Sequence, residues 1–204
     1  MKLPLQQFWL ILWSWTQQIP VLQAEALCNL SEKAIRHWYE QFRKHLPDDT
    51  VILDHVVQLD EAYFGGRKGY ALLMGKEAGT KKLAYHILAH TAPAKSDAFS
   101  FLQTYVKPKS RLNTDGSTIY KGIDKWWPVE HTYDIHKRFE FTNTSEIEGM
   151  FGVLRTFIRR MYHHTTPEKF PDIMCEFYYR FSHPEMFESP YEYLINALVL
   201  GPSR

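Results

Sequence analysis

The sequence has few cysteines, no long apolar run and almost no excess of charge. Cys28 and Cys175 lie far apart and form no CxxC pair, so we expect neither a disulfide framework nor a structural zinc site, and we expect a reducing compartment. The net charge is +1, from 24 basic and 23 acidic residues. This balance excludes binding to nucleic acid through overall charge alone, so any basic surface must be local.

The apolar residues are sufficient for a globular core. They make up 45% of the 204 residues, which suits one domain of ordinary size with a small appendage. Residues 8–13 form an apolar run that loosely imitates a secretory signal, but the run is short and glutamines flank it. No run reaches the roughly 20 apolar residues that cross a bilayer. We therefore expect a cytoplasmic, nucleoid-associated protein with no membrane partner.

Residues 1–49 have the pattern of a small helical unit. Pro4 suits the start of a first helix, Ile19 and Pro20 end it, and a second helix is expected at residues 21–27. Ser31 is suited to cap a third that continues to about residue 45. Short helices joined by a tight turn at residues 28–30 are typical of a helix-turn-helix. Its last helix would present Lys33 and Arg36 to a major groove of DNA, together with Arg43 and Lys44.

An alternative remains open for this segment, because acids and bases are balanced in it. The third helix also carries apolar and aromatic residues at helical spacing, namely Ile35, Trp38, Tyr39 and Phe42. These residues would let the unit act as a helical cap packed on the main domain.

A domain boundary is expected at residues 46–49, where a proline and two acids precede a β-branched run. The second domain then covers residues 50–204. Strands are expected at residues 51–60, 70–77, 81–90, 111–114 and 129–133, and helices at 96–106, 145–162, 167–181 and 190–198. The crossover helix before the fourth strand indicates parallel pairing of that strand with the first. This order is that of the ribonuclease H-like fold, an α/β architecture with a mixed sheet and flanking helices.

Three acidic residues stand where rigid elements begin or end. Asp60 closes the first strand, Asp115 follows the fourth, and Glu148 opens a long amphipathic helix. Parallel pairing would bring Asp60 and Asp115 side by side, with Glu148 facing them. Carboxylate oxygens are the ligands that magnesium selects, and two cations held this way can flank a scissile phosphate. We expect the three carboxylates to converge on two shared metal ions.

Each of these acids also has a structural interpretation. Asp60 would be a solvated strand end, and Asp115 with Gly116 would be a turn. Glu148 would form a capping box with Ser145, bonding back to the helix start. Adjacent strand residues face opposite sides, so Glu61 is not expected to point into the same site as Asp60.

Four short motifs resemble the DDE-type insertion-sequence transposases of the ISXO-like group, which are related to the Merlin elements. The motifs are residues 59–66, residues 114–116 with Tyr120, residues 143–151, and residues 176–181. They occur in order within residues 51–183. The separation of Asp115 and Glu148 by 32 residues is close to that of DDE enzymes and favours Glu148 over Glu146.

The resemblance implies a catalytic domain that acts on double-stranded DNA. Water would hydrolyse a phosphodiester at a transposon end, and the freed 3′-hydroxyl would then attack target DNA. The implied cofactors are two Mg²⁺ or Mn²⁺ ions held by Asp60, Asp115 and Glu148. Such a reaction joins two element ends, so a homodimer or higher oligomer is expected.

Phosphate contacts are expected from two basic places besides the third helix. Arg155 and Arg159 lie one helical turn apart on the Glu148 helix, with Arg160 beside them. Arg67 and Lys68 lie in the loop after the first strand. The alternative for the arginines is an ordinary solvated helix face.

Many relatives carry an amino-terminal zinc-binding segment with CxxC pairs, and this sequence contains none. Recognition of specific transposon ends is therefore an open question. Two rival functions remain: a structure-selective nuclease of the same fold that cuts without joining, and a retired transposase that only binds DNA.

Overall fold

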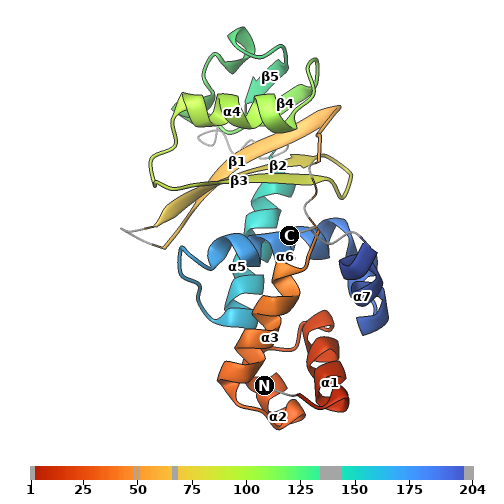
Figure 1. Cartoon of the computed structure of the whole chain (residues 1–204). Coiled ribbons are helices and arrows are strands. Elements are labelled where there is room, and N and C mark those ends of the chain that lie inside the picture. The colour runs from red at the N-terminus through yellow and green to blue at the C-terminus, as the bar shows by residue number, and fades with distance from the viewer. Residues whose placement is uncertain (1–2, 48, 50, 66–68, 134–143, 200–204) are drawn as a thin grey trace. The chain divides into compact units, whose positions relative to one another are not determined.

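The computed structural model describes residues 3–47, 49, 51–65, 69–133 and 144–199 (Figure 1). The chain forms two compact units. The helical unit combines residues 1–49 with 155–204, and the sheet unit consists of residues 50–154. The sheet unit thus begins at the expected boundary, whereas residues 155–204 belong to the helical unit. The division into domains 1–49 and 50–204 stays a prediction.

The sheet unit contains a five-stranded mixed sheet of order β3-β2-β1-β4-β5. Its elements are β1 (Val56–Phe64), β2 (Tyr70–Glu77), β3 (Leu83–Leu88), α4 (Lys95–Tyr105), β4 (Arg111–Thr114), η2 (Thr118–Tyr120), η3 (Ile123–Lys125), β5 (Glu130–Tyr133) and the first part of α5 (Ser145–Tyr162). Strands β1, β2 and β3 pair antiparallel, whereas β4 pairs parallel with β1 and with β5. The expected parallel pairing and the ribonuclease H-like fold are confirmed.

Strand β1 is shifted along the sequence relative to the expectation of residues 51–60. His55 has a left-handed backbone with φ of 59°, which interrupts extended structure just before Val56. Upstream of it, Leu53 makes only an isolated parallel bridge with Val106. At its other end β1 continues to Phe64. Asp60 is therefore an internal residue of the strand, and its interpretation as a strand end is wrong.

The two faces of the sheet carry different residues of β1, as the alternation of a strand requires. Val57 and Leu59 pack with Phe101 of α4 in a hydrophobic core. A Cβ at Gly75 of β2 would lie 2.9 Å from a carbon of Phe101, so a glycine there permits the close approach of the helix. Figure 1 shows α4 on one side of the sheet, and the start of α5 lies on the other side, where the N–H of Ile147 bonds to Gln58. Residue 58, and by alternation residue 60, therefore belong to the α5 side.

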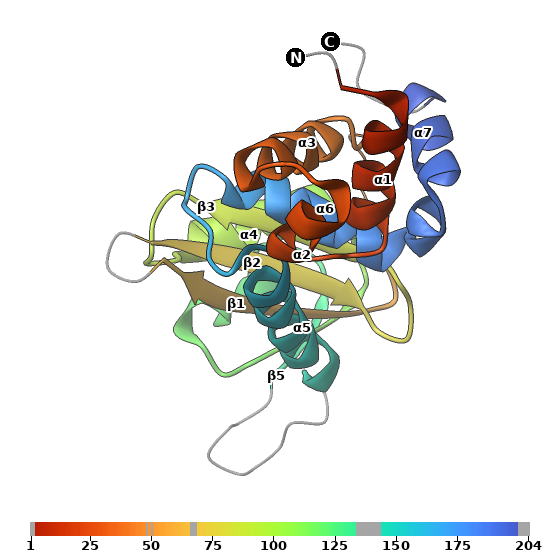
Figure 2. The ribbon, with the colours of Figure 1, turned by 90° about the horizontal axis from the view of Figure 1, so that it is seen from below.

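The helical unit gathers both ends of the sequence around aromatic side chains. Its elements are α1 (Leu5–Thr16), α2 (Val21–Cys28), α3 (Glu32–Lys44), the end of α5, α6 (Phe170–Ser182), η5 (Pro184–Phe187) and α7 (Pro190–Val199). The Trp15 ring lies 5.4 Å from the Phe42 ring and 4.9 Å from the Tyr193 ring, centroid to centroid. Figure 2 shows α1 beside α7 and α3 beside α6.

The expected helices near the amino terminus are present. Ser31 caps α3 by accepting a hydrogen bond from the backbone N–H of Ala34, and Asn29 in the left-handed conformation ends α2. The apolar face of α3 is buried through Ile35, Tyr39 and Phe42. This face of α3 packs inside the helical unit, and the interpretation of the unit as a cap on the main domain stays a prediction.

Candidate active site

Three carboxylates of the sheet unit lie close together. One oxygen each of Asp60, Glu61 and Asp115 lies within 4.8 Å of the others. In the parallel β1–β4 register, Val57 lies opposite Leu112 and Gln58 opposite Asn113. Continued by two residues, this register places Asp60 opposite Asp115. The structure therefore brings together the two aspartates that the sequence predicted to be neighbours. Among the described residues this is the acidic group with spacing suited to a metal ion.

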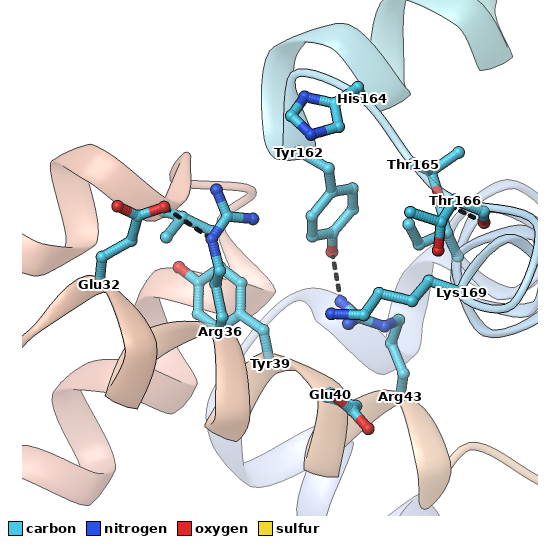
Figure 3. Close-up of a pocket in the computed structure, with 12 residues that line it drawn as sticks. Glu32, Arg36, Tyr39, Glu40, Arg43, Tyr162, His164, Thr165, Thr166 and Lys169 are labelled. Carbon is cyan, nitrogen blue, oxygen red and sulfur yellow. Dashed lines mark hydrogen bonds and ion pairs between the residues drawn. The ribbon is translucent and has the colours of Figure 1, made fainter.

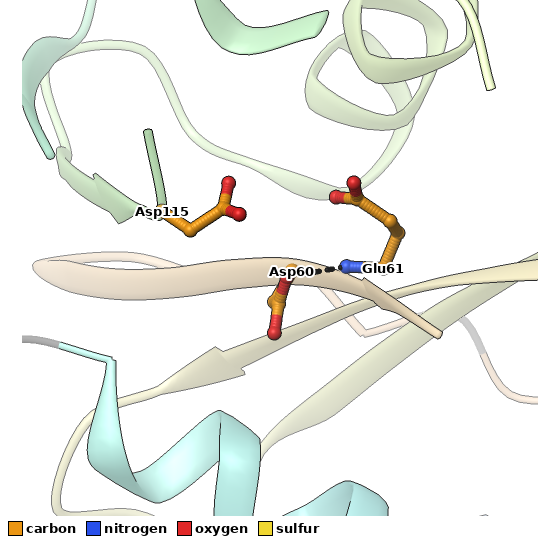
Figure 4. A group of neighbouring side chains, drawn as sticks. All are labelled: Asp60, Glu61 and Asp115. Carbon is orange, nitrogen blue, oxygen red and sulfur yellow. Dashed lines mark hydrogen bonds between the residues drawn. The ribbon is translucent and has the colours of Figure 1, made fainter. Parts of the chain in front are cut away.

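Glu61 was not expected to point into the same site as Asp60, yet one oxygen of each lies within 4.8 Å of the other. In Figure 4, Glu61 and Asp115 point toward one another on one side of β1, and Asp60 lies on the other side. Alternation along the strand is obeyed. However, Asp60 Oδ1 bends back to accept a hydrogen bond of 2.8 Å from the N–H of Glu61. This bend brings Asp60 to the level of the backbone and within reach of the other two.

Hydrogen bonds fix the other two members of this group. Asp115 Oδ1 accepts from the backbone N–H of Ser117 at 2.9 Å, the Asx-turn arrangement. The turn interpretation of Asp115 is thus present in the structure together with its approach to Asp60. Tyr120 is buried and donates its hydroxyl to Glu61 Oε2 at 2.6 Å. Tyr120 therefore links the segment after β4 to β1.

Glu148 lies outside the group of three but on the side of the sheet that Asp60 faces. The N–H of Ile147 donates to Gln58 Oε1 at 3.0 Å, and Gln58 is two residues before Asp60 on the same face of β1. The Glu148 carboxylate also raises the pKa of Asp60 through its negative charge, after larger contributions from burial and other acids. The docked helix start thus holds Glu148 near Asp60.

The capping box expected as an alternative for Glu148 is not formed within the described part of the chain. Glu148 Oε1 accepts a hydrogen bond of 3.2 Å from the hydroxyl of Thr144 rather than from the backbone of Ser145. Thr144 directly precedes the first helical residue, so Glu148 is one position too far along for that box. Glu146 is engaged elsewhere, with Lys76 and with the N–H of Gly79.

The electrostatics of the group favour a cation. Burial raises the pKa of Asp60 to about 7, and the charges of Glu61, Asp115 and Glu148 add to the shift against the lowering effect of the Glu61 N–H. Burial likewise raises the pKa of Glu61, and the Tyr120 hydroxyl opposes the shift. Burial and the neighbouring negative charges disfavour the ionised carboxylates, and a bound cation would stabilise them.

A cavity of about 360 Å³ lies beside Asp115. It is lined by Lys121, His131 and Tyr133, among others. His131 Nε2 lies 2.9 Å from the hydroxyl of Thr114, and burial lowers its pKa, which favours the neutral ring. Lys121 and Tyr133 are not among the site residues predicted from the sequence. The one sequence feature that could have indicated Lys121 is its position directly after Tyr120, a residue of the family-like motif.

The basic residues expected to contact DNA differ in their exposure to solvent and in whether an acid already pairs with them. Arg159 and Arg160 are exposed, and their side chains make no hydrogen bond or ion pair within the described ranges. Lys33 is exposed as well, whereas Arg36 is paired with Glu32 at 2.7 Å. Arg155 is also exposed on α5. Arg67 and Lys68 lie outside the described residues.

The family of the chain follows from comparison with known sequences. The family model described as the ISXO2-like transposase domain matches residues 52–182, well over half of the sequence. The chain belongs to this family. The match includes Asp60, Asp115 and Glu148, and it confirms a DDE-type insertion-sequence transposase domain. No curated protein matches the chain.

Two solved structures resemble parts of this transposase family member. One is the cryo-EM structure of the simian T-cell lymphotropic virus intasome in complex with PP2A regulatory subunit B56 gamma, with 15% identity and a TM-score of 0.44 over 74% of this chain and 63% of that chain. The other is the HTLV-2 integrase catalytic core domain in complex with magnesium, with 11% identity and a TM-score of 0.40 over 65% of this chain and 87% of that chain. The match thus spans less than two thirds of the first structure's chain.

Among the described residues, no helix combines the length and the apolar character that crossing a membrane requires.

Proposed function

We propose that this transposase family member cuts the ends of a DNA element and joins the freed 3′-hydroxyl to target DNA, with Asp60, Asp115 and Glu148 as the catalytic metal ligands. The observation that carries the proposal is the approach of Asp60, on β1, and Asp115, directly after the parallel strand β4, in a chain of the ISXO2-like family. The docking of the Glu148 helix on the Asp60 side supports the third ligand.

The donor set suits divalent ions such as Mg²⁺ or Mn²⁺. Asp60, Asp115 and Glu148 offer only oxygen atoms, which hard cations prefer. Held by these three carboxylates, two such ions would supply positive charge to the transferring phosphate and would orient the attacking and leaving oxygens. Glu61 adds a fourth carboxylate at the edge of the site, fixed by Tyr120.

The chain's own residues contribute positioning. The Ser117 N–H orients Asp115, the Glu61 N–H orients Asp60, and the Thr144 hydroxyl orients Glu148. Side chains fixed in this way lose little freedom when substrate binds, so the ligands are held for the reaction in advance. Asp60 must be ionised to bind a cation, and its raised pKa makes that step dependent on pH near neutrality.

DNA would be held by cationic side chains outside the carboxylate group. Arg155, Arg159 and Arg160 are exposed on α5, where they are available to phosphates. Lys33 is available in the same way, and Arg36 would first have to leave Glu32. Joining two ends requires two copies of the site, so we infer that a homodimer or larger assembly forms on DNA.

The test is an assay with supercoiled DNA that carries candidate element ends, incubated with Mg²⁺ or Mn²⁺. The protein should cut and join, and Asp115→Asn should lose both activities while it keeps its unfolding temperature. Glu130→Gln is the matched control, because Glu130 is an exposed acid of β5 in the same unit. A pre-cleaved end distinguishes a transposase from a nuclease, since only the former joins it. Full activity of Asp115→Asn would refute the proposal.

A further inference from the structure

The helical unit contains a cavity of about 380 Å³ that the carboxylate site does not use. It lies between α3 and the segment that connects α5 to α6 (Figure 3). Its lining includes Arg36, Tyr39, Arg43, Tyr162 and Lys169, and we call it the Arg43 pocket.

Arg43 is an unusual residue for the wall of a cavity, because only 7% of it is exposed. Its Nη1 donates to the Tyr162 hydroxyl at 2.8 Å and to Glu176 Oε2 at 3.4 Å. Its Nε is buried and has no partner among the described residues, and Nη2 makes no hydrogen bond with them either. A guanidinium is always charged, and a buried charge is costly unless its donors are paired.

The single carboxylate next to Arg43 is shared with a second guanidinium. Arg180 Nε donates to Glu176 Oε1 at 2.8 Å, and the Tyr162 hydroxyl donates to Oε2 at 2.5 Å. Arg180 is otherwise satisfied, because its Nη1 and Nη2 donate to the carbonyl oxygens of Thr16 and Trp15. Glu176 is fully buried. Two positive charges thus face one negative charge, and the donors left over belong to Arg43.

The other charges around the Arg43 pocket do not remove this excess. Glu32 is paired with Arg36 at 2.7 Å and Glu40 with Lys44 at 2.6 Å, so each acid is balanced on its own helix. Lys169 lines the pocket, and its ammonium makes no hydrogen bond or ion pair with the part of the chain that the structure describes. Figure 3 shows it extending from the opposite wall to that of Arg43. The pocket therefore offers Lys169, whose ammonium has no ion-pair partner among the described residues, and Arg43, whose one carboxylate is shared with Arg180.

We propose that the Arg43 pocket binds a phosphate group, with Arg43 and Lys169 as its cationic partners. Nε and Nη2 are neighbouring donors on one edge of the guanidinium, the fork that matches two oxygens of a phosphate. Lys169 adds a point charge from the other wall. The phosphate comes either from a small free anion or from the DNA backbone, and the second source rests on the proposed function.

The experiment is a calorimetric titration of the full chain with inorganic phosphate at constant ionic strength. Phosphate should bind the natural protein, and Lys169→Met should weaken binding by about tenfold, the range expected for the loss of one charge-assisted hydrogen bond. Lys125→Met is the matched control, because Lys125 is an exposed lysine outside the pocket, and it should bind phosphate normally. Arg43→Met should abolish binding where its circular dichroism shows a folded protein, and Lys169→Met carries the test where it does not.

Two further measurements are needed. One distinguishes DNA from a small anion as the source of the phosphate, and the other distinguishes failure of the pocket proposal from failure of the proposed function. A DNA duplex that displaces inorganic phosphate identifies the backbone as the ligand, whereas binding of phosphate that DNA does not displace identifies a small anion. Both results support the pocket. Asp115→Asn should bind phosphate normally, so loss of cleavage does not affect this test. The proposal is overturned if phosphate does not bind at millimolar concentration, or if it binds the Lys169→Met protein as tightly as the natural one.

Discussion

Gln58 and Lys76 lie directly opposite one another on β1 and β2, and both hold the first turn of α5. Gln58 accepts the N–H of Ile147, and Lys76 pairs with the carboxylate of Glu146. Both strand residues are almost fully buried. This cross-strand pair fixes the start of the helix that carries Glu148, and it does so on the face of the sheet where Asp60 lies.

Replacing Gln58 by leucine should therefore displace Glu148 without touching it. The Ile147 N–H would remain buried without an acceptor, which costs about 1–3 kcal/mol of the free energy of unfolding. A shift of about 1 Å in the helix start should lower the cleavage rate by about 100-fold. Urea unfolding and the cleavage assay measure the two effects. Gln58→Glu keeps an acceptor at this position and should recover much of both; equal losses in the two variants would contradict the positioning role.

Variants of Glu146 and Glu148 should have different effects, the first on stability and the second on catalysis. Glu146→Gln removes the charge that pairs with Lys76, so it should lower the free energy of unfolding by about 1 kcal/mol, a modest value because Glu146 is partly exposed. It should retain cleavage. Glu148→Gln should unfold normally, because among the described residues only the Thr144 hydroxyl bonds to the Glu148 side chain. It should lose cleavage, because Glu148 is the proposed metal ligand. The opposite pattern would assign the ligand to Glu146.

Asp60 should make metal-free stability depend on pH. Its pKa is about 7 in the folded protein against an ordinary 3.8, so the fold favours the protonated form. Its contribution to stability is greatest below pH 3.8, declines as the pH rises and is lost above about 7. Asp60→Asn should therefore be more stable than the natural protein at pH 8 in chelator, by about 1–3 kcal/mol.

Added Mg²⁺ provides the control for Asp60. It should raise the unfolding temperature of the natural protein above pH 7, because ligand binding to the folded state stabilises it. It should have little effect on Asp60→Asn. Thermal unfolding with and without metal measures both, and a variant that melts below the natural protein at pH 8 in chelator would show that the Asp60 charge is not destabilising.

Tyr120 should tune the metal site through Glu61. Tyr120→Phe removes the hydroxyl that donates to Glu61 at 2.6 Å, and this donor opposes the upward shift of the Glu61 pKa. The variant should lose about 1 kcal/mol of stability and bind Mn²⁺ several-fold more weakly at pH 7. Tyr133→Phe alters an exposed tyrosine of β5 and should leave Mn²⁺ binding unchanged. A Mn²⁺ titration that gives one affinity for all three proteins would remove Glu61 from the site.

The topology was predictable because it follows from local patterns. Strands show alternating apolar residues, and the crossover helix and the start of α5 at Ser145 have their own local sequence signals. Each signal depends only on a few neighbouring residues, and the observed elements agree with them. These features were sufficient to place Asp60 and Asp115 on adjacent strands. The start of β1 was not predictable, because it depends on the left-handed backbone of His55. The residues that flank His55 in the sequence do not require that conformation.

The proximity of Glu61 and the burial of Arg43 were also beyond the sequence. Glu61 approaches Asp60 because the Asp60 side chain bends to a backbone N–H, a rotamer choice that alternation does not determine. Arg43 was expected beside Lys33 and Arg36 as a DNA-facing residue. It is buried against Tyr162 and Glu176, residues more than a hundred positions away, so the correction required tertiary structure.

Arg159 and Arg160 give a test of DNA contact that does not depend on catalysis. Both are exposed on α5 without a side-chain partner in the described ranges, so their replacement by alanine should cost little stability. If each neutralises one phosphate, the double variant should reduce the slope of log affinity against log salt by about 1.8, because each contact with duplex DNA contributes about 0.9. Fluorescence anisotropy with duplex DNA across a series of salt concentrations measures the slope. An unchanged slope would mean that these arginines form only a solvated helix face.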